Sequence, residues 1–149
     1  MERRPRDDAP GYAPRAAWPV VILVDTSIWI EFFRRTRPLD LEAKVPFDDI
    51  VTCLPVIQEV LQGIRDDDPY RLAHQAMFAL PIVESPMPAG LFEEAISLFR
   101  STRRHGLTVR SSVDCVIAAC ALRHDLEIVH RDRDFEKLAR VSALRERTL

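Results

Sequence analysis

The sequence is poor in glycine and has no paired cysteine motif, and both absences limit what the chain can do. Its 4 glycines form neither GxGxxG nor GxxxxGK[ST], so the glycine-rich loops that bind nucleotide phosphates are excluded. The cysteines Cys53, Cys115 and Cys120 form no CxxC pair and lie among apolar residues. We therefore expect buried, reduced thiols in a cytoplasmic protein.

Long apolar runs and an excess of positive charge are also missing. The longest aliphatic run, Val20 to Val24, is far shorter than the roughly 20 residues that cross a bilayer, so we expect no membrane partner. The net charge of −2 does not by itself indicate nucleic-acid binding. Residues 1–18 are rich in Pro and Arg, and we expect a disordered or loosely packed extension there. Residues 19–149 are expected to form one domain.

Short β-branched or apolar runs alternate with amphipathic segments through this domain. The predicted strands lie at about 20–24, 50–53, within 80–86 and within 126–132. Helices are predicted after Asp25, from Pro55, at about 68–79, within 89–106, within 111–125 and within 134–141. The alternation predicts an α/β fold of three layers, α/β/α, with a central, mostly parallel sheet of four to five strands.

Polar residues at the helix starts indicate where each helix is capped. Thr26 or Ser27 is the expected N-cap of the first helix, and Ser111 or Ser112 that of the helix within 111–125. Asp134 is the expected N-cap of the last helix.

Four acidic residues are predicted at one end of the sheet. Asp25 follows the first strand and Asp132 follows the last, while Glu59 and Asp114 lie early in two helices. In such folds the ligand site lies beyond the carboxyl ends of the strands, where four carboxylates would repel one another. An all-oxygen set without zinc-spaced His or Cys suits a hydrated cation, Mg²⁺ or Mn²⁺.

Each acid also has a structural explanation. Asp25 could cap a helix, Glu59 could be a surface acid, and Ser111 with Asp114 matches a capping box. For the stretch after the last strand, a solvated ladder of Arg and Asp stays open. The triplet from His130 to Asp132 matches the start of a kinase catalytic loop, but the glycine-rich loop, the downstream Asn and the length of a kinase are missing.

The segments "LVDTSIWIEFF", "LPVIQEVLQGI" and "RSSVDCVIAACALRHDLEIVHRDRDF" occur in this order, and with them the chain resembles a PIN-domain ribonuclease from about Val20 to Arg140. More narrowly, it resembles the VapC toxins of bacterial VapBC toxin–antitoxin pairs. The resemblance implies a metal-binding catalytic set, with an auxiliary acid at Asp134 and supporting hydroxyls at Thr26 and Ser27. That set is Asp25, Glu59, Asp114 and Asp132. Many members have Thr or Ser where this chain has His130, and Ser27 could replace that hydroxyl.

The implied activity is hydrolysis of RNA phosphodiester bonds with Mg²⁺ or Mn²⁺. The resemblance further implies a cognate VapB-type antitoxin that covers the acids, and a homodimer. Arg110 and Arg131 are the basic residues nearest the expected site and are candidates for RNA phosphate binding. The alternatives are a catalytically silent PIN-like module that binds RNA or protein, and a housekeeping RNA-processing nuclease of the same fold.

Overall fold

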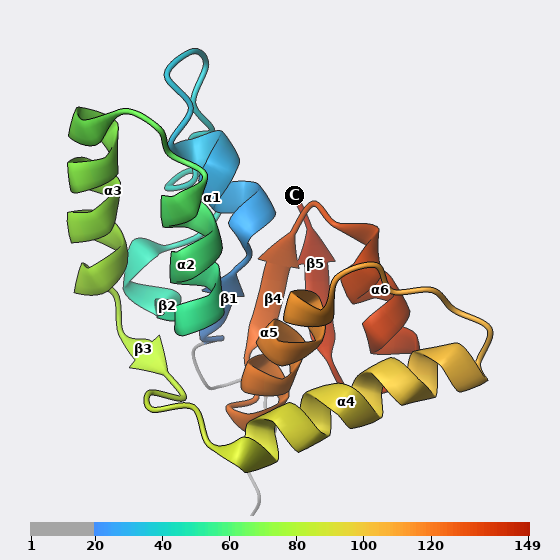
Figure 1. Ribbon diagram of the computed structural model, residues 1–149. Coiled ribbons are helices and arrows are strands. Elements are labelled where there is room, and N and C mark those ends of the chain that lie inside the picture. The colour runs from blue at the N-terminus through green and yellow to red at the C-terminus, as the bar shows by residue number, and fades with distance from the viewer. Residues whose placement is uncertain (1–19) are drawn as a thin grey trace, which may run out of the picture.

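The computed structural model describes residues 20–149, and the extension predicted for residues 1–18 lies outside the described residues. A sheet of five parallel strands forms the centre of the described part (Figure 1). The strands are β1 (Ile22–Val24), β2 (Ile50–Cys53), β3 (Ile82–Val83), β4 (Glu127–His130) and β5 (Arg145–Thr148). Their order across the sheet is β3-β2-β1-β4-β5. The α/β prediction with a parallel sheet is therefore confirmed.

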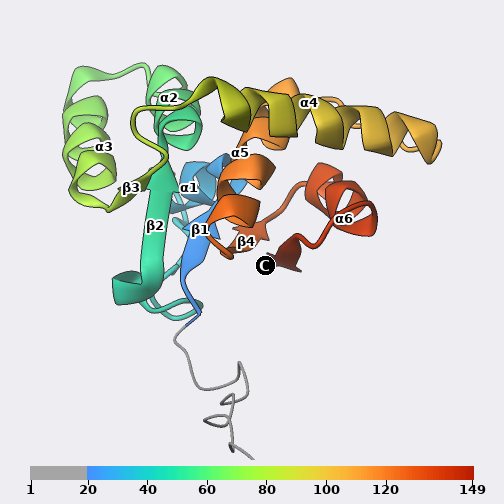
Figure 2. The same ribbon diagram turned by 90° about the horizontal axis from the view of Figure 1, so that it is seen from below.

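The helices of the described part flank this sheet. They are α1 (Thr26–Phe32), α2 (Leu54–Gln62), α3 (Asp67–Ala79), α4 (Ala89–Arg104), α5 (Ser112–Arg123) and α6 (Arg133–Arg140), with a short 3₁₀ turn, η2 (Phe47–Asp49). The long helix α4 runs across α5, and α3 packs on the outer side of α2 (Figures 1 and 2). Within residues 20–149, no helix combines the length and apolarity that crossing a membrane requires.

The middle of the sheet explains why the first apolar run is continuous. β1 pairs with β2 on one side and β4 on the other, so Leu23 lies between Val51 and Ile128. Leu23 and Val24 are fully buried, as a strand covered on both faces requires. Because β1 and β4 are neighbours, the residues that follow them, Asp25 and Arg131, come out at the same edge of the sheet.

The fifth strand has no counterpart among the runs identified in the sequence. β5 reads Arg-Glu-Arg-Thr and has no apolar residue, yet it pairs with β4 along its whole length. It is an edge strand, and charged side chains are common there because they discourage pairing with another chain. Arg147 of β5 donates to Glu127 of β4 at 2.8 Å, which ties the edge to the sheet.

Candidate metal-binding active site

The first acid lies where β1 passes into α1. Asp25 is buried, and its backbone N–H donates to the carbonyl of Val129 at 2.9 Å. Its Oδ2 accepts from the backbone N–H of Ser27 at 3.0 Å and from the Ser27 hydroxyl at 2.5 Å. Asp25 is thus the N-cap of α1. The expectation that Thr26 or Ser27 caps this helix was wrong. The Asp25 carboxylate accepts from the backbone N–H of Ser27, and the Ser27 hydroxyl donates to the same carboxylate instead of capping the helix.

The two hydroxyls after Asp25 connect three parts of the chain. The Ser27 hydroxyl oxygen also accepts from the backbone N–H of Arg131 at 3.0 Å, which joins α1 to the segment after β4. The Thr26 hydroxyl donates to Oε2 of Glu59 at 2.8 Å, which orients the α2 acid towards α1. Both residues therefore contact the acids that they were predicted to support.

The third acid lies in the first turn of α5. The Asp114 N–H donates to the Ser111 hydroxyl oxygen at 3.3 Å, and Ser111 is the N-cap of α5 as predicted. The Asp114 carboxylate is 6% exposed, and its Oδ2 has no hydrogen-bond partner among the described residues. Burial, followed by the negative charges of Asp25, Asp132, Glu59 and Asp134, raises the Asp114 pKa to about 7.

The last two acids lie at the start of α6. Asp132 is the N-cap of α6, and its Oδ1 accepts from the Asp134 N–H at 3.0 Å. Asp134 lies inside the first turn, so its predicted role as the cap was wrong. The helix starts two residues earlier than a cap at Asp134 would place it, at Arg133, because Asp132 already has the extended backbone that a cap needs.

Asp134 is 1% exposed, but both of its oxygens are hydrogen-bonded. Oδ2 accepts from the Arg110 backbone N–H at 2.7 Å, and Oδ1 accepts from the Lys137 ammonium at 2.7 Å. Burial raises the Asp134 pKa, but the Lys137 and Arg110 interactions outweigh it, and the pKa is lowered overall. Lys137 also donates to the Thr108 carbonyl at 2.6 Å, so this cluster anchors the loop between α4 and α5.

The fold brings three acids into one close group. Asp114, Asp132 and Asp134 each offer a carboxylate oxygen within 4.8 Å of the others. Asp25 and Glu59 lie outside this group, although their charges contribute to the raised pKa of Asp114. Burial raises the pKa of Asp25 as well, despite the hydrogen bonds from Ser27 that lower it.

The unpaired oxygens show whether this set fits a cation. Buried side-chain oxygens without a hydrogen-bond partner in residues 20–149 include Asp25 Oδ1 and Asp114 Oδ2. A buried carboxylate oxygen without a donor is costly, and a divalent cation is a partner that would satisfy such an atom. The nearby ligand atoms are all oxygens, which is the chemistry that Mg²⁺ and Mn²⁺ prefer. The residues present therefore fit such an ion.

The two predicted RNA-binding arginines differ in their surroundings. The exposed guanidinium of Arg110 lies 3.9 Å from Asp132 Oδ1 and 4.0 Å from Asp134 Oδ2. Arg131 instead donates to the Leu149 carbonyl at 3.1 Å and lies 3.9 Å from Glu31. Arg110 is thus at the acids, whereas Arg131 holds the chain end and α1.

Lys137 and the pair of His130 with Glu146 were not foreseen as part of this environment. One feature of the sequence could have indicated the Lys137 ion pair: Lys137 lies three residues after Asp134, on the same helix face. Glu146 had none, because β5 itself was not recognised.

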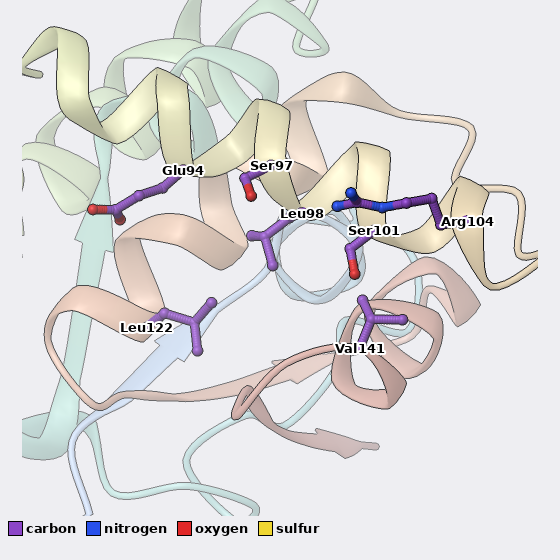
Figure 3. Close-up of a pocket in the computed structure, with 7 residues that line it drawn as sticks. All are labelled: Glu94, Ser97, Leu98, Ser101, Arg104, Leu122 and Val141. Carbon is purple, nitrogen blue, oxygen red and sulfur yellow. The ribbon is translucent and has the colours of Figure 1, made fainter.

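A separate groove of about 370 Å³ lies where α4 crosses α5 and the end of α6 (Figure 3). Its lining includes none of the predicted acids: it is formed by Glu94, Ser97, Leu98, Ser101, Arg104, Leu122 and Val141. It is therefore not the candidate metal centre.

Comparison with known proteins agrees with this geometry. Residues 22–141 match the PIN domain family. The chain belongs to the PIN-domain family. It is 39% identical over 129 residues to the VapC ribonuclease Mb1587 of Mycobacterium bovis and, equally, to ribonuclease VapC11 of Mycobacterium tuberculosis. Each alignment covers 83% of this chain and 96% of the relative.

This PIN domain also has the fold of solved relatives. A DNA-bound VapBC structure from Salmonella typhimurium superposes with a TM-score of 0.67 at 15% identity, covering 87% of this chain and 98% of that one. The predicted PIN fold is thus confirmed.

Proposed function

We propose that this PIN-domain chain is an endoribonuclease toxin that cleaves RNA with Mg²⁺ or Mn²⁺ and is neutralised by a cognate VapB-type antitoxin. The observation that carries the proposal is that Asp25 and Asp114 each bury an unpaired carboxylate oxygen, and that Asp114 lies in one group of acids with Asp132 and Asp134. The relatives that are 39% identical are named as VapC ribonucleases, and the Salmonella structure is a VapBC complex, which supports the activity and the partner.

Asp25, Asp114 and Asp132 would hold the cation, and Glu59, which Thr26 positions, would assist them. A cation held by these residues would supply activation of a water and stabilisation of negative charge on the phosphate and the leaving oxygen. Ser27 keeps Asp25 oriented through two hydrogen bonds. Asp134, with both oxygens engaged, serves mainly to hold the site together and is an auxiliary acid at most.

Arg110 would bind the RNA backbone next to the acids. Its side chain is 76% exposed, and its ion pairs with Asp132 and Asp134 are long and therefore weak. The guanidinium is thus free to bind a phosphate of the RNA backbone. Arg131 would contribute less, since the chain end already engages its guanidinium. The antitoxin would cover this same acidic surface.

The chain would work as a homodimer in the cytoplasm. Phe92 and Ile96 of α4 are exposed apolar side chains beside a groove of about 400 Å³ that Phe99, Val113 and Val116 also line. An apolar face of this kind favours self-association. The three free, buried cysteines agree with a reducing compartment. Light scattering should give a dimer mass that falls to the monomer mass in Ile96→Asp; a monomeric parent would contradict the dimer.

The Asp25→Asn variant tests the activity. The purified parent should cut RNA in Mg²⁺ or Mn²⁺ and not in EDTA, while Asp25→Asn should lose cleavage and keep its circular dichroism spectrum. Asp48→Asn, an exposed acid of η2, is the matched control and should cut like the parent. Cleavage by Asp25→Asn at the parental rate would refute the proposal.

Expression tests the toxin role. Induction of the chain should arrest growth, and co-expression with the product of a small upstream reading frame should restore it. Cleavage in vitro without growth arrest would favour a housekeeping RNA-processing nuclease. Absence of cleavage with retained RNA or protein binding would favour the silent module.

A further inference from the structure

A fully buried histidine lies beside the candidate metal centre and has no part in the mechanism above. His130 is the last residue of β4, is 0% exposed, and packs on Phe135 of α6 with ring centroids 5.1 Å apart. A buried imidazole needs partners for both ring nitrogens, because an unpaired buried nitrogen is costly.

Both nitrogens of His130 have partners of different kinds. Nδ1 lies 3.1 Å from the backbone nitrogen of Asp132, and Nε2 lies 2.7 Å from Oε2 of Glu146 on β5. A backbone N–H can only donate, so Nδ1 must present its lone pair. The ring proton is therefore on Nε2 and is donated to the Glu146 carboxylate. These contacts form a chain of hydrogen bonds from Glu146 through His130 to Asp132.

We infer that His130 and Glu146 are positioning residues that hold Asp132 in the orientation needed to bind a cation, an inference that rests on the proposed function. Oδ1 of Asp132 already accepts from the Asp134 N–H, so the direction of this carboxylate follows the backbone at Asp132. The ring of His130 fixes that backbone through the Asp132 N–H. Partners of this kind orient ligands at metal sites and affect metal affinity.

Glu146 contributes by holding the ring through Nε2–H. Without an acceptor at Nε2, this buried N–H is unpaired, and the ring can turn to reach another acceptor, which takes Nδ1 away from the Asp132 N–H. The Asp132 peptide would then be free to move and turn its carboxylate out of the group of acids. A glutamine at position 146 would still accept from Nε2–H, whereas a leucine would not.

The β4–β5 pair offers a matched control. Glu127 of β4 accepts from Arg147 of β5 at 2.8 Å, so it also links the two strands, but it does not contact His130. Glu127→Leu therefore removes a glutamate and a cross-strand link at comparable exposure, 22% against 24% for Glu146. Any general effect of weakening β5 should appear in both variants.

The first test needs no metal. Long-range ¹⁵N–¹H spectra of the metal-free parent should show a pyridine-like Nδ1 and a pyrrole-like Nε2 for His130. Glu146→Gln should keep this pattern, and Glu146→Leu should shift or broaden the Nδ1 and Nε2 resonances, because the ring no longer has a partner that holds it through Nε2–H. A parent with the proton on Nδ1, or a Glu146→Leu pattern identical to that of the parent, would overturn the inference.

The second test measures Mn²⁺ affinity by calorimetry, with thermal unfolding in EDTA as the check on folding. Glu146→Leu should bind Mn²⁺ about 10–100-fold more weakly than the parent. Glu146→Gln and Glu127→Leu should stay within a few-fold of the parent. An unchanged affinity in Glu146→Leu, an equal loss in Glu127→Leu, or an equal loss in Glu146→Gln would each overturn the positioning role.

Two variants of the histidine itself complete the test. His130→Asn places an amide oxygen near the position of Nδ1 and can still accept from Asp132, whereas His130→Leu has a similar shape and no acceptor. Mn²⁺ should bind His130→Asn more tightly than His130→Leu, and equal affinities would count against the role. A parent that binds no Mn²⁺ would overturn the proposed function as well, whereas a binding parent with insensitive variants would overturn only this inference.

Discussion

The first turns of α5 and α6 each bury an aspartate, and the two carboxylates have opposite electrostatic surroundings. Asp114 is 6% exposed, Oδ2 has no hydrogen-bond partner in the described part of the chain, and the pKa is raised to about 7. Asp134 is 1% exposed, accepts from Lys137 and the Arg110 N–H, and has a lowered pKa.

The difference between these turns separates an acid whose hydrogen bonds are complete from one whose hydrogen bonds are not. Both aspartates are buried, but only Asp134 has hydrogen-bond donors for both carboxylate oxygens and so forms a stable ion pair. Asp114 lacks a donor for one oxygen, so its negative charge is not compensated. The fold thus completes the hydrogen bonding of Asp134 by itself but leaves Asp114 to be completed by something else. A divalent cation is the partner that the surrounding acids suit best.

The largest effect is expected from removing the satisfied acid. Asp134→Ala leaves the Arg110 N–H without its acceptor and the Lys137 ammonium with only the Thr108 carbonyl, and should lower the free energy of unfolding by about 2–3 kcal/mol. Urea unfolding in EDTA would measure this, with Asp48→Ala as an exposed control. A loss of less than about 0.5 kcal/mol would mean that the cluster does not hold the α4–α5 loop.

The unsatisfied acid should behave in the opposite way. The folded pKa of Asp114, about 7, lies above the ordinary value of 3.8, so between these pH values the folded protein holds a proton that the unfolded chain releases. Stability of the metal-free protein should therefore fall as pH rises from about 4 to about 7 and stay low above that range.

Asp114→Asn removes this cost, because asparagine does not ionise. In EDTA at pH 8, the variant should be more stable than the parent by on the order of 2 kcal/mol, and at pH 4 the two should be nearly equal. Thermal unfolding at both pH values would measure the difference. A variant less stable than the parent at pH 8 would show that the Asp114 charge is already compensated.

The smallest effect is expected from the exposed Arg110 side chain, which lies beside Asp132 and Asp134 at the start of α6. Arg110→Gln keeps the backbone N–H that serves Asp134 and removes only the exposed guanidinium, so folding should be unchanged. RNA binding should weaken a few-fold, and its dependence on salt should fall by about one released counterion. Arg71→Gln on α3 is the control, and an equal loss in both variants would leave Arg110 without a specific role.

The sequence was sufficient to predict the α/β fold and the edge of the sheet where the acids lie, because apolar runs and helical periodicity determine both. It did not reveal β5, whose charged residues pair through the backbone alone. It misassigned two caps, since Asp25 and Ser27, or Asp132 and Asp134, are equally good caps by residue type. Only the folded structure shows which side chain accepts from the free backbone N–H groups at the helix start.

The opposite character of Asp114 and Asp134 was also beyond the sequence. Both are acids in a first helical turn, where the helix dipole favours them equally. Their difference comes from Lys137 and the Arg110 N–H, which the fold brings to one acid and not to the other. His130 was equally obscure, because its partner Glu146 lies on the unrecognised strand.

The most direct test of the central claim, that Asp114 is left unsatisfied in order to bind a divalent cation, is calorimetric titration of the metal-free protein with Mn²⁺ near pH 7. The parent should bind and release a proton as it does so, because Asp114 is partly protonated at that pH, and the measured enthalpy should therefore depend on the ionisation enthalpy of the buffer. Asp114→Asn should bind far more weakly and release fewer protons. Equal affinity and equal proton release in the two proteins would contradict the account.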